Sequence, residues 1–294
     1  WQTVTHVTLA LSMLCLPELH AEKCGFDFTI NVFTYNRPDG LKRLWKSLLE
    51  TDYMGVQVDL VLFQDYDRAQ ELNYTASELN RFISTEATWP HGKFQVFKKL
   101  KRDGLVSSIM SAWWPTSENS LAAFFEDDLE VSPFWFRWVY QALHKYYFVP
   151  DRHPKLIGFS LYRPTTDELT TQRVSPKNGY QPFAYQQPCS WGQVMFPGPW
   201  RYFRQWKGKM YRAPNINNPK MMWVNSDLWQ DSTSWKKYLI YLMYHWGLFM
   251  IYPNFPQRYV LSTNHFMKGE HPSPGYETYH LPLLTPGIWQ SWER

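Results

Sequence analysis

The chain has 294 residues, of which 44% are hydrophobic and 19% are charged. This composition provides enough apolar side chains for a large core and excludes an intrinsically disordered protein. The 30 Lys and Arg residues against 26 Asp and Glu residues give a net charge of +4, without a dense basic block. A nucleic-acid partner is therefore not expected. The three cysteines include no Cys-x-x-Cys pair, so the sequence predicts no zinc site.

Residues 6–16 form an apolar run, HVTLALSMLCL, that is short of the roughly 20 residues a membrane helix needs. Followed by Leu19-His20-Ala21, the run resembles the hydrophobic region and cleavage site of a secretory signal, with a buried helix as the alternative. We therefore expect residues 1–23 to be a signal or anchor remnant. The expected location is the secretory pathway, in the lumen of the endoplasmic reticulum or Golgi, with the cytoplasm as the alternative.

From Cys24 onward, strand and helix patterns alternate. Phe28–Thr34 is rich in β-branched and aromatic residues and predicts a strand, and Val56–Phe63 predicts the next one. Between them, leucines recur at helical spacing after Pro38, and a proline suits the first turn of a helix. This βαβ unit predicts parallel strands joined by a right-handed crossover.

The alternation continues along the chain. Ser132-Pro133 predicts a helix start, and Gly247 predicts the end of a later helix. The segment from Pro182 to Pro219 is rich in Pro and Gly and predicts irregular structure. The pattern as a whole predicts one α/β domain with a mostly parallel central sheet and helices on both faces. The other predicted elements are a helix at Leu105–Trp114 and strands at Phe94–Phe97, Leu121–Phe125, Leu156–Leu161 and, as the last strand, Leu248–Tyr252.

Three adjacent acids, Glu126, Asp127 and Asp128, directly follow the predicted strand Leu121–Phe125. Open α/β sheets bind ligands at the carboxyl ends of their strands, so this position suits a site. Adjacent carboxylates repel each other and need a cation or hydrogen bonds beside a hydrophobic sheet. Ligands that are all oxygen favour Mg2+ or Mn2+ bound together with substrate phosphates. A solvated acidic turn at the start of a helix is the alternative.

The segment EDDLEV, residues 126–131, followed by Ser132-Pro133-Phe134, closely resembles the EDD segment of nucleotide-sugar-dependent glycosyltransferases of the GT-A fold, especially the N-acetylglucosaminyltransferase I type. The resemblance spans roughly residues 26–272 and implies a nucleotide-binding half at residues 24–130 and an acceptor half at residues 131–294. The weaker matches are Asn36-Arg37, Gln64-Asp65, the acceptor-side segment Pro188–Trp200, and Ser262–His271, which is similar to a flexible loop that closes over the donor.

The resemblance implies a role for each of the three acids. Asp128 would bind Mn2+ or Mg2+, Asp127 the ribose, and Glu126 the region of the donor sugar. Glu126 is accordingly grouped with the catalytic residues. A divalent ion next to a diphosphate neutralises the charge that develops on the departing oxygen.

Five further side chains are donor or metal candidates by the same resemblance. Asp65 would read the uracil base, and Arg37 and Arg102 would hold the nucleotide or diphosphate. His265 would complete the metal shell, and Lys268 would contact the diphosphate. For each, the alternative is an ordinary turn or surface residue.

One departure from the family concerns the catalytic base. The family places an aspartate pair after a tryptophan near a helix start, where this chain has Trp235-Lys236-Lys237. Protonated lysines cannot accept the acceptor's proton unless strongly perturbed. Asp231 is our first candidate for the base, with Asp227 and Glu270 as further candidates, although Asp231 also suits a helix cap. A retaining reaction, which needs no such base, stays open.

The sequence therefore predicts a metal-dependent glycosyltransferase that moves a sugar from a nucleotide diphosphate donor, most plausibly a UDP-sugar, to a hydroxyl of a glycan or glycoconjugate. A nucleotidyltransferase is one alternative, but TYNRPDG stands where its Gly-rich phosphate loop would follow the first strand. A catalytically inactive sugar- or nucleotide-binding protein is the other alternative, and Lys236 and Lys237 support it.

Overall fold

The computed structural model describes residues 25–68, 72, 77–167, 172–210, 235–265, 267 and 280–292. Within these residues, no helix is long and apolar enough to cross a membrane. The features predicted elsewhere lie outside the described residues: the apolar N-terminal run and the side chains of Asp227, Asp231, Lys268, Glu270 and His271.

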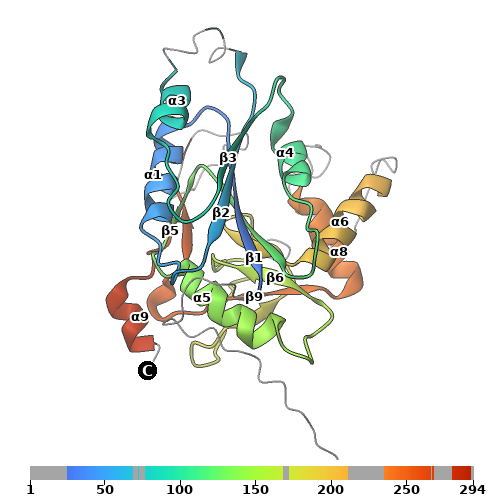
Figure 1. Cartoon of the computed structure of the whole chain (residues 1–294). Helices are drawn as coiled ribbons and strands as arrows, with labels where there is room; N and C mark the ends of the chain where they lie inside the picture. Colours follow the sequence, from blue (N-terminus) through green and yellow to red (C-terminus); the bar gives the residue numbers. More distant parts are fainter. Residues whose placement is uncertain are drawn as a thin grey trace, which may run out of the picture.

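An eight-stranded sheet forms the centre of the molecule, in the order β3-β2-β1-β4-β8-β6-β9-β7 (Figure 1). The first four strands are parallel to one another, β8 is antiparallel to both β4 and β6, β9 is parallel to β6, and β7 is antiparallel to β9. The carboxyl ends of β6 and β9 therefore lie at the same sheet edge as those of β1 and β4. The strands are β1 (Asp27–Thr34), β2 (Val58–Gln64), β3 (Phe94–Lys98), β4 (Ser120–Glu126), β6 (Leu156–Ser160), β7 (Phe183–Tyr185), β8 (Gln193–Met195) and β9 (Phe249–Tyr252).

Helices cover both faces of this sheet (Figure 1). Strand β4 shows how the core divides, because Leu121, Ala123 and Phe125 pack with α1 and α5, whereas Ala122 and Phe124 pack with α4, α6 and α8. The α/β class with a mostly parallel sheet and helices on both faces is thus confirmed. The helices are α1 (Pro38–Leu49), α3 (Glu78–Arg81), α4 (Gly104–Ala112), α5 (Trp135–Ala142), α6 (Pro197–Met210), α8 (Lys236–Trp246) and α9 (Pro286–Trp292), with π-helical turns at Phe82–Glu86 and Leu143–Tyr147 and a 3-10 turn at Pro256–Arg258.

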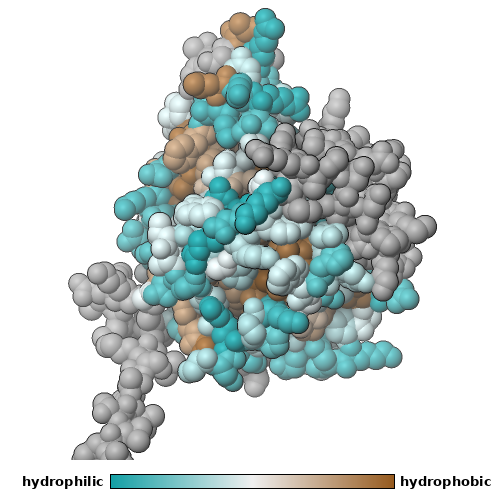
Figure 2. Space-filling view, turned by 90° about the vertical axis from the view of Figure 1, so that its right-hand side faces the viewer, coloured by the Kyte–Doolittle hydropathy of each residue, from teal (hydrophilic) through white to brown (hydrophobic). Residues whose placement is uncertain are grey.

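Figure 2 views the molecule from the side on which Figure 1 places α4 and α6. Hydrophilic side chains dominate this face, and hydrophobic areas are exposed between them. Tyr202 of α6 and Trp246 of α8 are two exposed aromatic residues that contact each other, with 5.7 Å between their ring centroids.

Several predicted boundaries are confirmed. α1 begins at Pro38, and α8 ends at Gly247, whose φ of 63° is in the left-handed region where glycine is favoured. The prediction of irregular structure from Pro182 to Pro219 was wrong where β7, β8 and α6 form. Strands of three residues are too short to show a periodicity, and the prolines of α6 lie in its first turn, where proline is tolerated.

A small second sheet was not predicted. β5 (Leu129–Val131) pairs antiparallel with β10 (Ser262–Asn264), so the three acids lead into a strand before α5 begins, and β9 is not the last strand. Ser132 anchors the segment, because its backbone N–H donates to the Leu261 carbonyl (2.9 Å) and its hydroxyl donates to the Leu284 carbonyl (2.7 Å). The same hydroxyl accepts from the backbone N–H of Phe134 (3.2 Å), at the start of α5.

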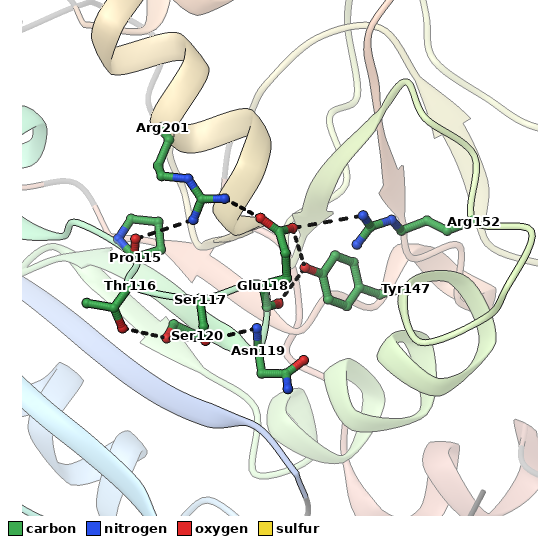
Figure 3. A network of polar contacts seen from close by, with 9 residues as sticks. All are labelled: Pro115, Thr116, Ser117, Glu118, Asn119, Ser120, Tyr147, Arg152 and Arg201. Carbon is green, nitrogen blue, oxygen red and sulfur yellow. Dashed lines mark hydrogen bonds and ion pairs between the residues drawn. The ribbon is translucent and has the colours of Figure 1, made fainter. Parts of the chain in front are cut away.

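The opposite end of β4 is fixed by Glu118 (Figure 3). Its carboxylate forms ion pairs with Arg201 of α6 and with Arg152, and its backbone carbonyl accepts a hydrogen bond from the Tyr147 hydroxyl (2.6 Å). Arg201 also donates to the Pro115 carbonyl (3.3 Å). Side chains from both faces of the sheet therefore hold the start of the strand whose far end carries the acids.

A substitution of Gly158 tests how closely β6 and β8 approach each other. An added Cβ would overlap the carbonyl oxygen of Val194 in β8, and neither backbone can move without breaking the pairing. We expect Gly158→Ala to lower the free energy of unfolding by about 1–3 kcal/mol in urea titrations. Gly208→Ala is the matched control, because no described atom lies within 4 Å of its added Cβ in α6, and there alanine is expected to be neutral or stabilising by up to about 1 kcal/mol. Equal stability of the two variants would contradict the packing argument.

Candidate active site

Charged side chains meet at the carboxyl ends of β1 and β4, which are parallel neighbours in the sheet. Arg37 follows β1 and immediately precedes α1, while Asp127 and Asp128 form the turn after β4. β1 leads to α1 on one face, whereas β4 is entered from α4 on the other face. Such a switch between neighbouring parallel strands leaves a crevice at their carboxyl ends, where α/β sheets bind ligands.

Asp127 is fully buried, and the protein itself engages both of its carboxylate oxygens. Oδ2 accepts a hydrogen bond from the Thr34 hydroxyl (2.7 Å), and Oδ1 forms an ion pair with Arg37. Burial raises the pKa of Asp127 to about 6, although Arg37 and Thr34 act in the opposite direction. Asp127 thus fixes the turn from inside, and its predicted contact with a ribose stays a prediction.

Asp128 keeps one carboxylate oxygen available. Oδ2 accepts a hydrogen bond from Arg37 (3.0 Å), whereas Oδ1 is buried and has no hydrogen-bond partner among the residues that the structure describes. An unsatisfied buried carboxylate oxygen is unfavourable, and a bound cation or ligand donor would satisfy it.

Arg37 joins the two aspartates through a single guanidinium group. Burial lowers the pKa of Arg37, but the carboxylates of Asp127 and Asp128 outweigh this effect, so the net shift is upward. Arg37 therefore stays charged and offsets part of the negative charge at this edge. Its predicted role toward a diphosphate is compatible with this position but is not tested by it.

Glu126 ends β4 and is only partly exposed. Burial raises its pKa to about 8, and the neighbouring Asp128 carboxylate adds to the shift, whereas Arg37 and Lys236 oppose it. The influence of Lys236 shows that the start of α8 lies near the acids. Lys237 is buried, with its ammonium 5.2 Å from the Tyr238 ring centroid. Lys236 is therefore the lysine of this pair that acts on the candidate site.

His265 lies opposite Asp128 in the β5–β10 ladder, where its backbone N–H donates to the Asp128 carbonyl (2.8 Å). Its ring contacts a different acid, because Nε2 is 2.6 Å from the Glu130 carboxylate. Burial lowers the pKa of His265 despite this carboxylate. The sequence analysis gave Glu130 no role, although the polar and apolar alternation of residues 128–131 indicates that Asp128 and Glu130 share one face of a strand.

The described residues can bind a divalent cation only if a substrate supplies further oxygen ligands. Among the described residues, no three His, Cys, Asp or Glu side chains gather as metal ligands. The unpartnered Asp128 Oδ1 nevertheless offers one oxygen ligand to such an ion. Mg2+ and similar ions typically take one or two carboxylates and complete their shell with water and phosphate oxygens.

Asp65 and Arg102 lie at the same edge, after β2 and β3. The Asp65 carboxylate accepts hydrogen bonds from the backbone N–H groups of Asp103 (3.0 Å) and Gly104 (2.9 Å), and so holds the start of α4. Arg102 stacks over Tyr35, with 4.9 Å between the guanidinium carbon and the ring centroid. Asp65 therefore has the structural role in a turn that the sequence analysis gave as the alternative. Its contact with a uracil base stays a prediction.

A family model described as SPBC1E8.03c C-terminal domain matches residues 40–215, which is more than half of the chain. The chain belongs to this family. The region that matches the SPBC1E8.03c C-terminal domain includes Glu126, Asp127 and Asp128, whereas Arg37 and His265 lie outside it. No curated protein matches the chain.

Solved structures similar to the chain share 11–12% sequence identity with it. One is mannosyltransferase PcManGT from Pyrobaculum calidifontis in complex with GDP-Man and Mn2+ (12% identity, TM-score 0.43), where the match covers 82% of this chain and 59% of that chain. Another is GalNAc-T7 with UDP, GalNAc and Mn2+ (12% identity, TM-score 0.48), where the match covers 78% of this chain and 42% of that chain. A third is S. aureus TarS 1-349 in complex with UDP-GlcNAc (11% identity, TM-score 0.40), where the match covers 84% of this chain and 60% of that chain. The chain thus spans less than two thirds of the length of each.

A substitution of Gly40 in α1 tests whether the position of the acidic turn depends on its contact with this helix. An added Cβ would overlap the Asp127 carbonyl oxygen and the Met267 sulfur, so Gly40→Ala must displace the turn. We expect it to lower the free energy of unfolding by about 1–3 kcal/mol and to abolish any stabilisation by Mn2+ plus UDP in thermal unfolding. Gly208→Ala again serves as the control. A Gly40→Ala protein that unfolds like the control and responds to Mn2+ plus UDP would rule out this dependence.

Proposed function

We propose that the protein is a metal-dependent glycosyltransferase that transfers a sugar from a nucleotide diphosphate donor, a UDP-sugar, to a hydroxyl of a glycan or glycoconjugate. The observation that carries the proposal is the buried, unpartnered Oδ1 of Asp128 beside Arg37, at the carboxyl ends of β1 and β4. Because two adjacent strands supply one cation and a free carboxylate oxygen there, the crevice suits a metal–diphosphate group.

The protein's own residues would prepare this crevice before a donor binds. Thr34 and Arg37 hold Asp127, and the second nitrogen of the Arg37 guanidinium orients Asp128. A fixed carboxylate needs no reorganisation when charge develops on a leaving group. Bound Mn2+ or Mg2+ would neutralise the charge on the departing diphosphate. The candidate contact to the base is Asp65, and Arg102 is a candidate contact to the nucleotide or diphosphate; they lie after β2 and β3. Asp127 is the candidate contact to the ribose.

The proposed base is Asp231. The described lysines near the acids do not suit the task, because a protonated ammonium has no lone pair with which to accept a proton. Asp231 precedes α8, whose first residue, Lys236, acts electrostatically on Glu126.

An inactive protein that binds a nucleotide sugar is the second candidate. The observation that favours it is the position of Lys236 and Lys237 at the start of α8. The glycosyltransferases that the sequence resembles have an aspartate pair at this place. The two functions differ in one measurable way. A binding protein is stabilised by donor plus Mn2+ without releasing nucleotide, whereas an enzyme also releases it.

Asp128→Ala tests the metal role. We expect nucleotide release from a panel of UDP- and GDP-sugars with Mn2+ to fall by roughly 100-fold or more, because the metal supplies several kcal/mol of charge stabilisation. Mn2+-dependent binding of UDP, measured by calorimetry, should be lost as well, and the unfolding transition should stay cooperative.

Asp151→Ala is the matched control, since Asp151 is an exposed acid in a loop. It should release nucleotide at the wild-type rate. Wild-type release and binding in Asp128→Ala would remove Asp128 from the metal site.

Asp231→Asn tests the base. Asparagine caps a helix almost as well as aspartate but cannot accept a proton. If Asp231 is the base, transfer to the acceptor should fall by about 10²- to 10⁴-fold while UDP-sugar binding and the unfolding midpoint stay at wild-type values. Near-normal transfer by this variant would exclude Asp231 as the base; it is not the N-cap of α8, which is Trp235.

A further inference from the structure

A second candidate site lies in the acceptor half, at the carboxyl ends of β6 and β9. It is a cavity of about 460 Å³ formed by the residues just after these strands and by the segment 173–180. Its walls include four basic side chains, and none of the described residues that line it is acidic. The four are Arg163, Arg173, Lys177 and Arg258.

Arg163 lines this cavity, and the residue is only 8% exposed. Among the described residues, it has no hydrogen-bond or ion-pair partner. Burial lowers its pKa, and the charges of Arg258 and Arg173 lower it further, whereas Tyr180 acts in the opposite direction. A desolvated guanidinium next to like charges is unfavourable unless an anion compensates it.

Several other described arginines pair with a carboxylate. Arg37 pairs with Asp127, Arg137 with Asp52 (2.6 Å), and Arg201 with Glu118. Arg163 has no such carboxylate partner among the described residues, although it is more deeply buried (8% exposed) than the side chains of Arg137 (34%) and Arg201 (29%). No described residue that lines the cavity supplies a counter-charge for Arg163, and a bound anionic group would supply one.

The backbone around the cavity is strained in a way typical of functional sites. Four described non-glycine residues have a positive φ, and three of them line the cavity: Tyr180 (63°), Gln257 (52°) and Arg258 (63°). The two walls are joined by a hydrogen bond from the Asn254 side-chain amide to the Asn178 side-chain carbonyl (2.6 Å). The basic side chains are thus presented by a fixed frame.

We propose that this cavity binds an anionic group, a phosphate or sulfate ester or a carboxylate, carried by the acceptor glycan. Arginine's planar fork of donors matches the paired oxygens of such groups, and several arginines around one cavity provide more donors than a neutral hydroxyl could use. Arg163 would supply the buried contact, and Arg258 and Arg173 would contact the anion from the cavity wall.

The assignment to the acceptor rests on the proposed function and on sheet topology. β6 and β9 run in the same direction as β4, so the cavity lies at the same sheet edge as Asp128, with β8 between the two halves. The acidic crevice suits a donor bound through a metal. A basic cavity elsewhere on the same edge suits a different ligand, and the second substrate of a transferase is that ligand.

Binding of inorganic phosphate and sulfate tests the cavity without any activity assay. Isothermal titration at low ionic strength should show saturable binding to the wild-type protein and at least about tenfold weaker binding to Arg163→Gln. Arg258→Asn should weaken binding as well, because asparagine tolerates the left-handed backbone while it removes the charge. Lys93→Gln, which removes an exposed charge immediately before β3, should bind like the wild type.

Thermal unfolding gives a second readout. Without an anion, Arg163→Gln should unfold at or above the wild-type temperature, because the change removes a buried charge next to like charges. Phosphate should stabilise the wild type but not the variant. No saturable binding to the wild type, or binding that both arginine variants retain, would overturn the anion site.

A glycan array then tests the source of the anion. The wild-type protein should be retained on phosphorylated, sulfated or uronate-containing glycans more than on their neutral counterparts, and Arg163→Gln should lose this preference. Phosphate binding without such a preference overturns the acceptor assignment. The proposed transferase function is tested separately by nucleotide release in the Asp128 variants, so either idea can fail while the other stands.

Discussion

The bridge from Arg37 to Asp127 and Asp128 is the contact on which the rest of the candidate active site depends. Two adjacent carboxylates at the end of a buried strand repel each other, and Asp127 has no water to screen its charge. Arg37 reaches them because β1 and β4 are direct neighbours. Thr34, the last residue of β1, donates a hydrogen bond to the other carboxylate oxygen of Asp127. This network holds Asp127 inward, and the adjacent residue, Asp128, is left with one carboxylate oxygen that no described group satisfies.

The sheet edge separates charge of opposite sign. Toward β1 and β4, the carboxylates of Asp127 and Asp128 are balanced in part by Arg37, whereas after β6 and β9 the described cavity walls carry four basic side chains and no acid. A sheet edge with this pattern suits two ligands of different character, one bound through a cation and the other bound as an anion. The strands between them are packed on both faces, so the two regions cannot collapse onto each other to neutralise their charges.

Local patterns were enough to predict the elements that form the core, because β1, β2 and β4 are rich in β-branched and aromatic residues and α1 and α8 carry clear end signals. They were not enough for β5, β7, β8 and β10, whose three residues acquire strand geometry only through partners distant in the chain. The site divides in the same way. The adjacent acids were visible in the sequence, whereas the pairing of Glu130 with His265 and the unpartnered burial of Arg163 depend on tertiary contacts between segments far apart in the chain.

Short backbone links fix the spacing between the two candidate sites. The carbonyl of Leu161, two residues before Arg163, accepts hydrogen bonds from the backbone N–H groups of Leu261 (2.9 Å) and Ser262 (3.2 Å). Ser262 begins β10, and three residues later the His265 N–H donates to the Asp128 carbonyl (2.8 Å). A continuous path of backbone hydrogen bonds therefore runs from the basic cavity to the acidic turn. Because substrate positioning requires reacting groups to be held within a fraction of an ångström, this rigid connection is what a two-substrate reaction at one sheet edge needs.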